Sequence, residues 1–316
     1  MILYLLRRAG RAVLLLLAVS VLLFLLLQAA PGEFFSDMRL NPQISEQTLA
    51  ALRAEYGLDR PLPSRYWHWL ESVARGDMSY SFAYNLPASE LLWPRARNTL
   101  LLTIPALILS WTLAIPLGVL AAWWRGKWSD RIFSSGTSTL LALPDLLLAL
   151  LMLLLALRTG WFPAGGASST MGPERLADRI WHMVLPVAAL TIGALPILLR
   201  HVRSSVREAL DFPFIRAAQA HGVSTARILF SHCLRAAANP LISLFGLSIA
   251  GLLSASLLIE VVMSWPGIGP MLVEAIISRD LFLVIGAVML STLFLVLGNL
   301  MADLLLYTAD PRIRVR

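Results

Sequence analysis

The sequence predicts an all-α membrane protein whose chain crosses a lipid bilayer six times. Hydrophobic residues make up 58% of the 316 residues and charged residues only 14%, whereas a soluble domain is nearer to half apolar and one quarter charged. The apolar residues also gather into stretches of about 20, the length that a helix needs to cross a hydrocarbon core. Because Cys233 is the single cysteine of the sequence, an intrachain disulfide is excluded.

Six of these stretches are bounded by charged residues, and each is predicted to be a membrane-spanning helix. They are Ala12–Ala30, Asn98–Trp124, Ile132–Leu157, Ile180–Leu199, Ala236–Ile259 and Leu281–Ala302. Only Asp145 places a carboxylate inside such a stretch. Prolines also fall inside them, and because neighbouring helices can satisfy the freed carbonyls, they predict kinked rather than broken helices. These prolines are Pro105, Pro116, Pro144, Pro186 and Pro196.

The distribution of arginine predicts that the N-terminus and the C-terminus are both cytoplasmic. With this orientation the inside segments hold 15 basic and 4 acidic residues, while the outside segments hold 11 basic and 12 acidic residues. Basic residues accumulate in cytoplasmic loops, and here the whole positive surplus lies on one face of the membrane. The net charge of +7 therefore indicates topology and not nucleic-acid binding.

The region before the second span is predicted to hold an anchor helix and an external segment. A secretory signal is the alternative for residues 1–30, because arginines precede an apolar run. However, Pro31 stands where the cleaved bond would be, and residues 1–6 are themselves apolar, which favours a retained anchor. In the external segment, residues 31–97, Ser45–Tyr56 has the apolar spacing of an amphipathic helix.

The sequence lacks the motifs of an ATPase or of a metal site. A P-loop needs a lysine that follows a glycine-rich turn and precedes Ser or Thr, whereas the single lysine, Lys127, is followed by Trp128. The five histidines are scattered. His232 and Cys233 are adjacent, and adjacent residues of one helix do not face each other. No metal site and no enzyme activity are therefore predicted.

Asp145 is expected to face a cavity or a partner, because an acid near a helix centre costs roughly 2.5 to 3.5 kcal/mol in lipid. Two interpretations of Asp145 are open. Either it marks the substrate path, for which Glu260 is a second candidate, or it forms a cap or a pair within the helix bundle beside Pro144. An ion-coupled secondary carrier is an alternative function. Such a carrier uses several acids and repeated halves, whereas here Glu260 and Asp303 stand only at span ends.

The longest inside connection, residues 200–235, has the pattern of a structured helical loop. Pro213 suits the first position of a helix and Gly222 the position after its end, and Ser224 is predicted to cap a second helix. One face of the first helix has small residues that let a partner approach closely. This face holds Phe214, Ala217, Ala218 and His221. The alternative is a solvated hairpin that only joins two spans.

The run from Phe214 to Gly222 resembles the cytoplasmic EAA loop of ABC importer permeases, in the form found in the dipeptide, oligopeptide and nickel group. Further matching stretches extend the resemblance over essentially the whole chain. They are Pro31-Gly32, Gly57 to Pro61 with Tyr66, Gly76-Asp77, Glu260 with Trp265 to Gly269, Arg279-Asp280 and Asp310 to Arg314.

The resemblance implies a type I ABC importer fold in a bacterial-type inner membrane. The anchor (1–30) and external segment (31–97) precede a permease core of five membrane helices (98–307) and a cytoplasmic tail (308–316). The implied partners are a second permease, two cytoplasmic ATPase subunits that bind ATP and magnesium, and an external solute-binding protein. The chain itself would hold no cofactor. Peptides are the favoured substrates, with nickel or another small solute as the alternative.

The resemblance also implies two groups of site residues. The ATPase-coupling loop would use Phe214, Arg216, Ala217, Ala218, Ala220 and Gly222. An external turn would comprise Trp265, Pro266, Gly267 and Gly269. The sequence departs from the family pattern in lacking the glutamate of the EAA loop, and at four further positions. These positions are Ser79, Gln219, His221 and Met263. We predict that Gly222 is the most sensitive position of the coupling loop.

Overall fold

The computed structural model describes residues 2–29, 47, 59–169 and 176–309, which form helices and one short hairpin. The amphipathic helix predicted at Ser45–Tyr56 lies almost wholly outside these residues. The chain divides into two compact units. The first, unit 1, comprises residues 1–98 and 267–294, and the second, unit 2, comprises residues 99–266 and 295–316. Each unit is therefore built from two stretches that are separated in the sequence.

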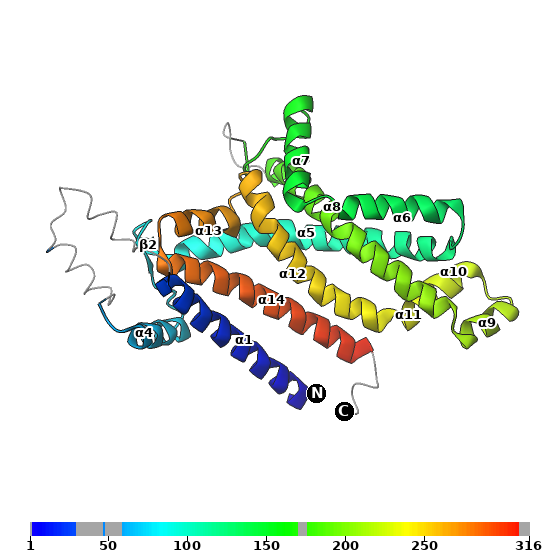
Figure 1. Cartoon of the computed structure of the whole chain (residues 1–316), viewed down its shortest axis with the longest axis horizontal. Coiled ribbons are helices and arrows are strands. Elements are labelled where there is room, and N and C mark those ends of the chain that lie inside the picture. Colours follow the sequence, from blue (N-terminus) through cyan, green and yellow to red (C-terminus); the bar gives the residue numbers. More distant parts are fainter. Residues whose placement is uncertain (1, 30–46, 48–58, 170–175, 310–316) are drawn as a thin grey trace. The chain divides into compact units, whose positions relative to one another are not determined.

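Within the described part of the chain, five helices are long and apolar enough to cross a membrane. They are α1 (Ile2–Ala29), α5 (Ala88–Trp123), α8 (Leu176–Leu210), α12 (Ala238–Val262) and α14 (Leu281–Ala309). A sixth span is obtained when α6 (Trp128–Leu141) and α7 (Asp145–Thr159) are counted together. In Figure 1 their colours follow the sequence, from blue for α1 to red for α14. The predicted spans are thus recovered, with the third in two pieces.

The prediction that Ile132–Leu157 forms one kinked helix is wrong. The axes of α6 and α7 differ by 94° across residues 142–144. Pro144 lacks a backbone N–H and disfavours helical geometry in Leu143, so the helix ends before it. Asp145 is consequently the first residue of α7 and not a group near a helix centre. By contrast, Pro186 and Pro196 lie inside α8 without ending it.

Two helices also begin or end outside the predicted apolar limits. α5 begins at Ala88, ten residues before the expected start of the second span. α8 continues to Leu210, beyond the expected end at Leu199. The added turns of α8 carry arginines, and charge ends an apolar run without ending a helix. Hydropathy therefore located the membrane-crossing part of these helices but not their full length.

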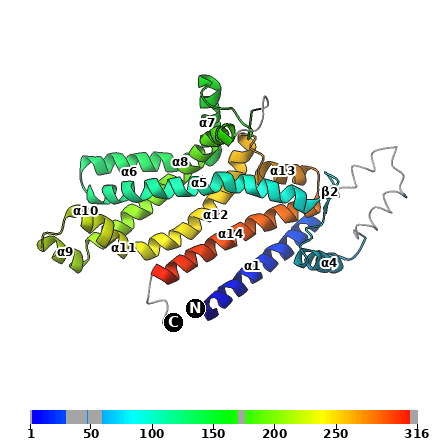
Figure 2. The same cartoon turned by 180° about the vertical axis from the view of Figure 1, so that it is seen from behind.

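In unit 1, an aromatic cluster joins α1 to α4 (Leu62–Ala74). The ring of Phe24 lies 5.2 Å from Tyr66 and 5.2 Å from Trp69, measured between centroids. Ile285 of α14 is fully buried in the same cluster. The Tyr66 hydroxyl also hydrogen-bonds the Ser20 hydroxyl of α1 at 3.0 Å. Figure 2 shows α4 beside the C-terminal part of α1.

The hairpin of unit 1 is tied to α14 through the buried carboxylate of Asp280. Tyr80–Ser81 (β1) pairs antiparallel with Leu86–Pro87 (β2). The Ser81 hydroxyl and the Ala83 amide donate to Asp280 Oδ2 at 2.6 and 3.0 Å. The Leu283 amide donates to Asp280 Oδ1 at 3.2 Å, so Asp280 also caps the N-terminus of α14.

A second contact within unit 1 joins the hairpin loop to α13 (Ile268–Ile277). The Tyr84 hydroxyl donates a hydrogen bond to the carboxylate of Glu274. Burial and this carboxylate raise the pKa of Tyr84 to about 12. The phenol is therefore a neutral donor at physiological pH, and the hairpin has contacts with both α13 and the N-terminus of α14.

Four helices end in the same hydrogen-bonded turn, in which a left-handed residue follows the helix. Glycine occupies this position after α4, at Gly76, and after α9 (Pro213–Ala220), at Gly222, with φ values of 86° and 75°. Ser264 after α12 and Arg279 after α13 have φ values of 52° and 56°. A side chain in this conformation costs roughly 1 to 2 kcal/mol, so the last two turns are held by the surrounding packing.

Candidate functional site

The loop predicted at residues 200–235 folds around α9, an eight-residue helix at the end of α8. Pro213 is its first residue, as predicted, and Phe212 is its N-cap. At its other end, the Gly222 amide donates to the Gln219 carbonyl at 3.0 Å and the Val223 amide donates to the Ala218 carbonyl at 3.1 Å. These two bonds need the left-handed glycine, so the predicted role of Gly222 in ending the helix is confirmed.

One residue of α9 anchors the helix and the others are displayed. Ile215 is fully buried in an apolar cluster with α5, α8 and α12. Phe214 is 50% exposed, Ala218 is half-buried, and the remaining coupling-loop candidates are exposed. These exposed candidates are Arg216, Ala217, Ala220 and Gly222. The predicted small-residue face is therefore accessible to a partner, while the helix is fixed from behind.

The segment after α9 returns through a π-helical turn. Thr225–Arg227 (α10), Ile228–Cys233 (η1) and Leu234–Ala236 (α11) follow one another into α12. Ser224 occupies the N-cap position of α10, but its side chain makes no capping hydrogen bond, so the predicted side-chain cap is wrong. The Ser224 carbonyl accepts from the Ile228 amide instead, at 3.0 Å.

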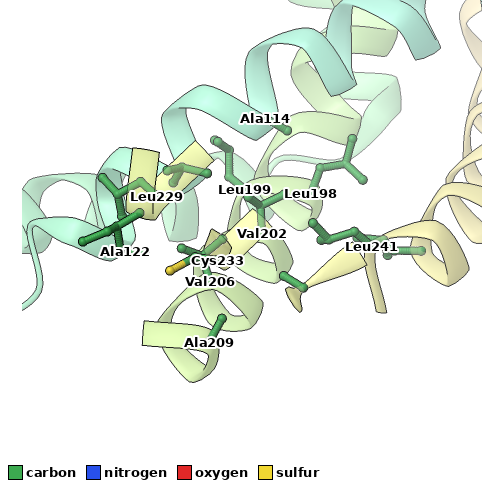
Figure 3. Packing of buried hydrophobic residues seen from close by; sticks show 14 of the residues in the cluster. Ala114, Ala122, Leu198, Leu199, Val202, Val206, Ala209, Leu229, Cys233 and Leu241 are labelled. Atoms are coloured by element: carbon green, nitrogen blue, oxygen red, sulfur yellow. The ribbon is translucent and has the colours of Figure 1, made fainter. Parts of the chain in front are cut away.

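Cys233 belongs to the packed core beneath this loop. Figure 3 shows its sulfur beside Val206, with Val202 of α8 and Leu229 of η1 in the same cluster. Burial raises the pKa of the Cys233 thiol, which makes it a poor nucleophile. Among the described residues, no three His, Cys, Asp or Glu side chains are grouped as a metal site would require.

A buried ion cluster that the sequence analysis did not single out joins α6 to α8. Asp130 is 8% exposed, and its carboxylate accepts hydrogen bonds from Arg203 and Arg207, the latter at 3.0 Å. The Gly126 amide donates to the same carboxylate at 3.2 Å. Arg203 and Arg207 lie one turn apart on the stretch of α8 that leads to α9. The sequence signal was the single acid among the basic residues of the predicted inside connection at residues 125–131.

A cavity of about 400 Å³ lies between α7, α8 and α12, all within unit 2. Most of its wall is apolar or glycine, and its polar side chains are Asp145, His201 and Ser248. The other lining residues are Leu190, Gly193, Ala194, Ile197, Leu198, Leu244, Leu247, Gly251, Leu252 and Ala255. The volume is within the range of about 300 to 1,000 Å³ that is usual for small-molecule sites.

Asp145 enters this cavity from the first turn of α7. A Cβ added to Gly193 of α8 would lie 2.8 Å from Asp145 Oδ1, so the carboxylate rests directly on the backbone of α8. At position 193, only glycine leaves room for the Asp145 carboxylate. Asp145 is predicted either to mark a substrate path or to cap or pair within the bundle beside Pro144. The structure places it on a cavity wall and also at the break beside Pro144. The described residues offer it no ion-pair partner.

Glu260, the second pathway candidate, does not line this cavity. Its side chain is fully buried near the end of α12, and its carbonyl accepts from the Trp265 amide at 2.9 Å in the turn that ends the helix. Trp265 is fully buried in the second apolar cluster of unit 2. Gly267 then becomes the N-cap of α13, and Gly269 is buried in that helix. Pro266 lies between Trp265 and Gly267 in the sequence, where the chain passes from unit 2 to unit 1.

Together, the apolar helices, the cavity around Asp145 and the displayed helix at the end of α8 are typical of a multi-pass membrane protein of the transporter class. The comparison with known proteins identifies the family. Residues 114–315 match the family described as binding-protein-dependent transport system inner membrane component, and residues 1–89 match the N-terminal region of the same systems. The chain belongs to this family and is a permease subunit of the bacterial inner membrane.

Curated relatives match over nearly the whole length. The oligopeptide transport system permease protein AppB of Bacillus subtilis is 34% identical over 312 residues, which is 98% of each chain. The glutathione transport system permease protein GsiC of Salmonella typhimurium is 33% identical over 314 residues, or 99% of each. A chain of the inward-facing MetNI methionine ABC transporter is 20% identical, with a TM-score of 0.53 over 69% of this chain and 97% of that one. This structural likeness confirms the type I ABC importer fold.

Proposed function

We propose that the chain is the transmembrane subunit of an ATP-driven importer of di- or oligopeptides. The observation that carries the peptide assignment is the full-length similarity to permeases that are named for oligopeptide and glutathione transport. Solute would be delivered by an external binding protein. The chain would form the pathway with a second permease, and ATP and magnesium would be bound by two separate cytoplasmic ATPase subunits.

The arrangement of α9 supports a role in receiving force from an ATPase. Ile215 fixes the helix to a core that includes α5, α8 and α12. A displacement of α9 by the ATPase would therefore be transmitted to these three helices. The exposed side of α9 offers Phe214 as an apolar contact beside small residues. A helix that is exposed on one face and rigidly seated on the other is suited to docking without reorganisation. In this function α9 faces the cytoplasm, in agreement with the predicted orientation of the termini.

The cavity around Asp145 supports a place for that residue in the translocation pathway. A carboxylate that faced hydrocarbon would cost several kcal/mol, whereas here it opens into a hollow of about 400 Å³. Glu260 is buried in the turn at the end of α12. We therefore keep Asp145 as the pathway residue and assign Glu260 to the support of the external turn.

The function is tested by coexpressing the chain with candidate subunits for the second permease, the ATPases and the external binding protein. We expect copurification with the ATPase subunits, and ATP-dependent uptake of peptides into vesicles that requires the binding protein. Uptake that followed a proton or sodium gradient without ATP would instead identify a secondary carrier. Uptake of nickel and not of peptide would retain the importer and replace the substrate.

Replacing Gly222 by valine should uncouple the ATPase. A branched residue in the left-handed conformation costs about 1 to 2 kcal/mol, although a Cβ at Gly222 meets nothing within 4 Å. The expected loss therefore comes from a changed end of α9 and not from a clash. Copurification of the ATPase and ATP-driven uptake should both fall by more than half.

Gly76→Val is the matched control for this variant. Gly76 also has a positive φ, of 86°, ends a helix by the same turn and has nothing within 4 Å of an added Cβ. It should cost similar stability and leave the copurified amount of ATPase unchanged. Equal ATPase loss in both variants would show a general folding defect and refute the coupling role of Gly222.

A further inference from the structure

The cavity between α7, α8 and α12 combines one acid with an apolar wall. Asp145 is the single carboxylate among the described residues that line it, and leucine, isoleucine, alanine and glycine make up most of the rest. Small-molecule sites of this kind use a few polar groups to fix the orientation of a ligand and apolar groups to enclose it. The composition of the wall therefore favours a ligand that has one polar or charged group and apolar substituents.

Asp145 is left without a protein partner in the part of the chain that the structure describes. The hydrogen bonds and ion pairs of these residues do not include its carboxylate, and Arg203 and Arg207 of α8 are engaged by Asp130. The N-terminal end of α7 favours a negative charge at this position, because its free N–H groups carry partial positive charge. An occupant that offered a cation would supply the missing partner.

The other two polar side chains of the cavity are already engaged by neighbouring groups. The Ser248 hydroxyl accepts from Trp111 Nε1 at 3.0 Å and donates to the Phe245 carbonyl at 2.7 Å. His201 Nδ1 lies 2.9 Å from the Ile197 carbonyl, one turn earlier on α8. The charge that the wall presents is therefore concentrated at Asp145, while most of the remaining surface selects for apolar groups.

We propose that Asp145 binds the protonated amino group of the transported solute, while apolar substituents of the solute lie against the leucine-lined wall. This inference rests on the importer function proposed above and narrows its substrate class. The favoured solutes are peptides with a free amino terminus and apolar side chains. Acylation of the amino terminus removes the cation and leaves Asp145 unpaired, so acylated peptides bind less well at this site.

Gly251 provides a reporter position for the test. It lines the cavity, is exposed, and a Cβ at this position meets nothing within 4 Å. Gly251→Cys in a Cys233→Ala background therefore places the single thiol of this chain in the cavity without a clash. The purified complex of both permeases and the ATPases is labelled with a charged maleimide, in the absence of the binding protein, so that selectivity of that protein does not contribute.

The probes are dileucine and N-acetyl-dileucine, each titrated as a protectant of the thiol. We expect half-protection by dileucine at a concentration at least about tenfold lower than by the acetylated form, a difference of about 1.4 kcal/mol. Asp145→Asn, which keeps the shape of the side chain, should abolish this difference, and Asp145→Glu should restore part of it. Glu90→Gln, the same chemical change at an exposed position outside the cavity, should leave it unchanged.

Equal protection by both peptides, protection by neither, or a preference that survives Asp145→Asn would each overturn the assignment. The importer function is tested separately by measuring uptake in the wild-type complex. That function fails if this complex shows no uptake that depends on ATP and on the binding protein. A complex that imports peptides but shows no amino-group preference at Gly251→Cys retains the proposed function and loses only this inference.

Discussion

Replacing Asp280 by alanine should destabilise unit 1 more than any other single change proposed for it. The substitution removes the cap of α14 and leaves the buried Ser81 hydroxyl and the Ala83 amide without their acceptor. A lost cap costs about 0.5 to 2 kcal/mol and the orphaned buried Ser81 hydroxyl about 1 to 3 kcal/mol. The expected total is about 2 to 5 kcal/mol. Thermal unfolding in detergent, followed by tryptophan fluorescence, should show a midpoint lowered by at least about 5 °C.

Two variants serve as controls for the Asp280→Ala experiment. Asp77→Ala removes an exposed carboxylate whose hydrogen bond among the described residues is from the Ser79 amide, at 2.9 Å, and should lower the midpoint by less than about 2 °C. Arg279→Gly replaces an exposed side chain at φ 56° by the residue that tolerates this conformation, and should leave the midpoint unchanged or raise it. An unchanged midpoint in Asp280→Ala would show that water replaces these contacts and that the hairpin is not anchored there.

Replacing Asp130 by alanine should have an effect of similar size in unit 2. The carboxylate is mostly buried and accepts from Arg203, Arg207 and the Gly126 amide. Its removal leaves two neighbouring guanidinium groups that repel each other, and breaking a buried pair in this way costs about 3 to 5 kcal/mol. Because these arginines lie on the turns of α8 that lead to α9, uptake should fall together with the unfolding midpoint.

The exposed ion pair between Arg125 and Asp211 is the control for this experiment. Its nitrogen and oxygen are 3.6 Å apart and both side chains are 65% exposed. Such pairs contribute about 0 to 1 kcal/mol, so Asp211→Ala should change neither the midpoint nor uptake appreciably. Equal effects of Asp130→Ala and Asp211→Ala would contradict the role assigned to burial.

Sequence reasoning succeeded where the signal was local. Pro213 and Gly222 predicted the limits of α9 because each residue fixes its own backbone geometry. The apolar runs located the membrane helices because the required length is set by the bilayer. Ser224 was placed correctly at a helix start, but the hydrogen bond of its hydroxyl depends on a rotamer that the sequence does not specify.

Other features depend on packing between distant segments and could not be predicted. Pro144 breaks the third span whereas Pro196 does not interrupt α8, and both stand in apolar runs, so the surroundings decide the outcome. Asp130 meets arginines that lie 73 and 77 residues further along the chain. Ser81 and Asp280 are 199 residues apart. No spacing rule links such residues, and the cavity around Asp145 likewise exists only once three helices are packed.

The division of the chain has a consequence for its synthesis. Unit 1 draws on residues 1–98 and again on residues 267–294, so roughly 170 residues must be translated between its two parts. At about 5 to 20 residues per second, a ribosome needs roughly 10 to 30 s for this interval. Throughout that time Phe24 and Trp69 lack Ile285, and Ser81 lacks Asp280. The first-made part of unit 1 must therefore persist as a partly assembled intermediate, and a delay or truncation during translation exposes its unfilled contacts to membrane insertion and quality-control factors.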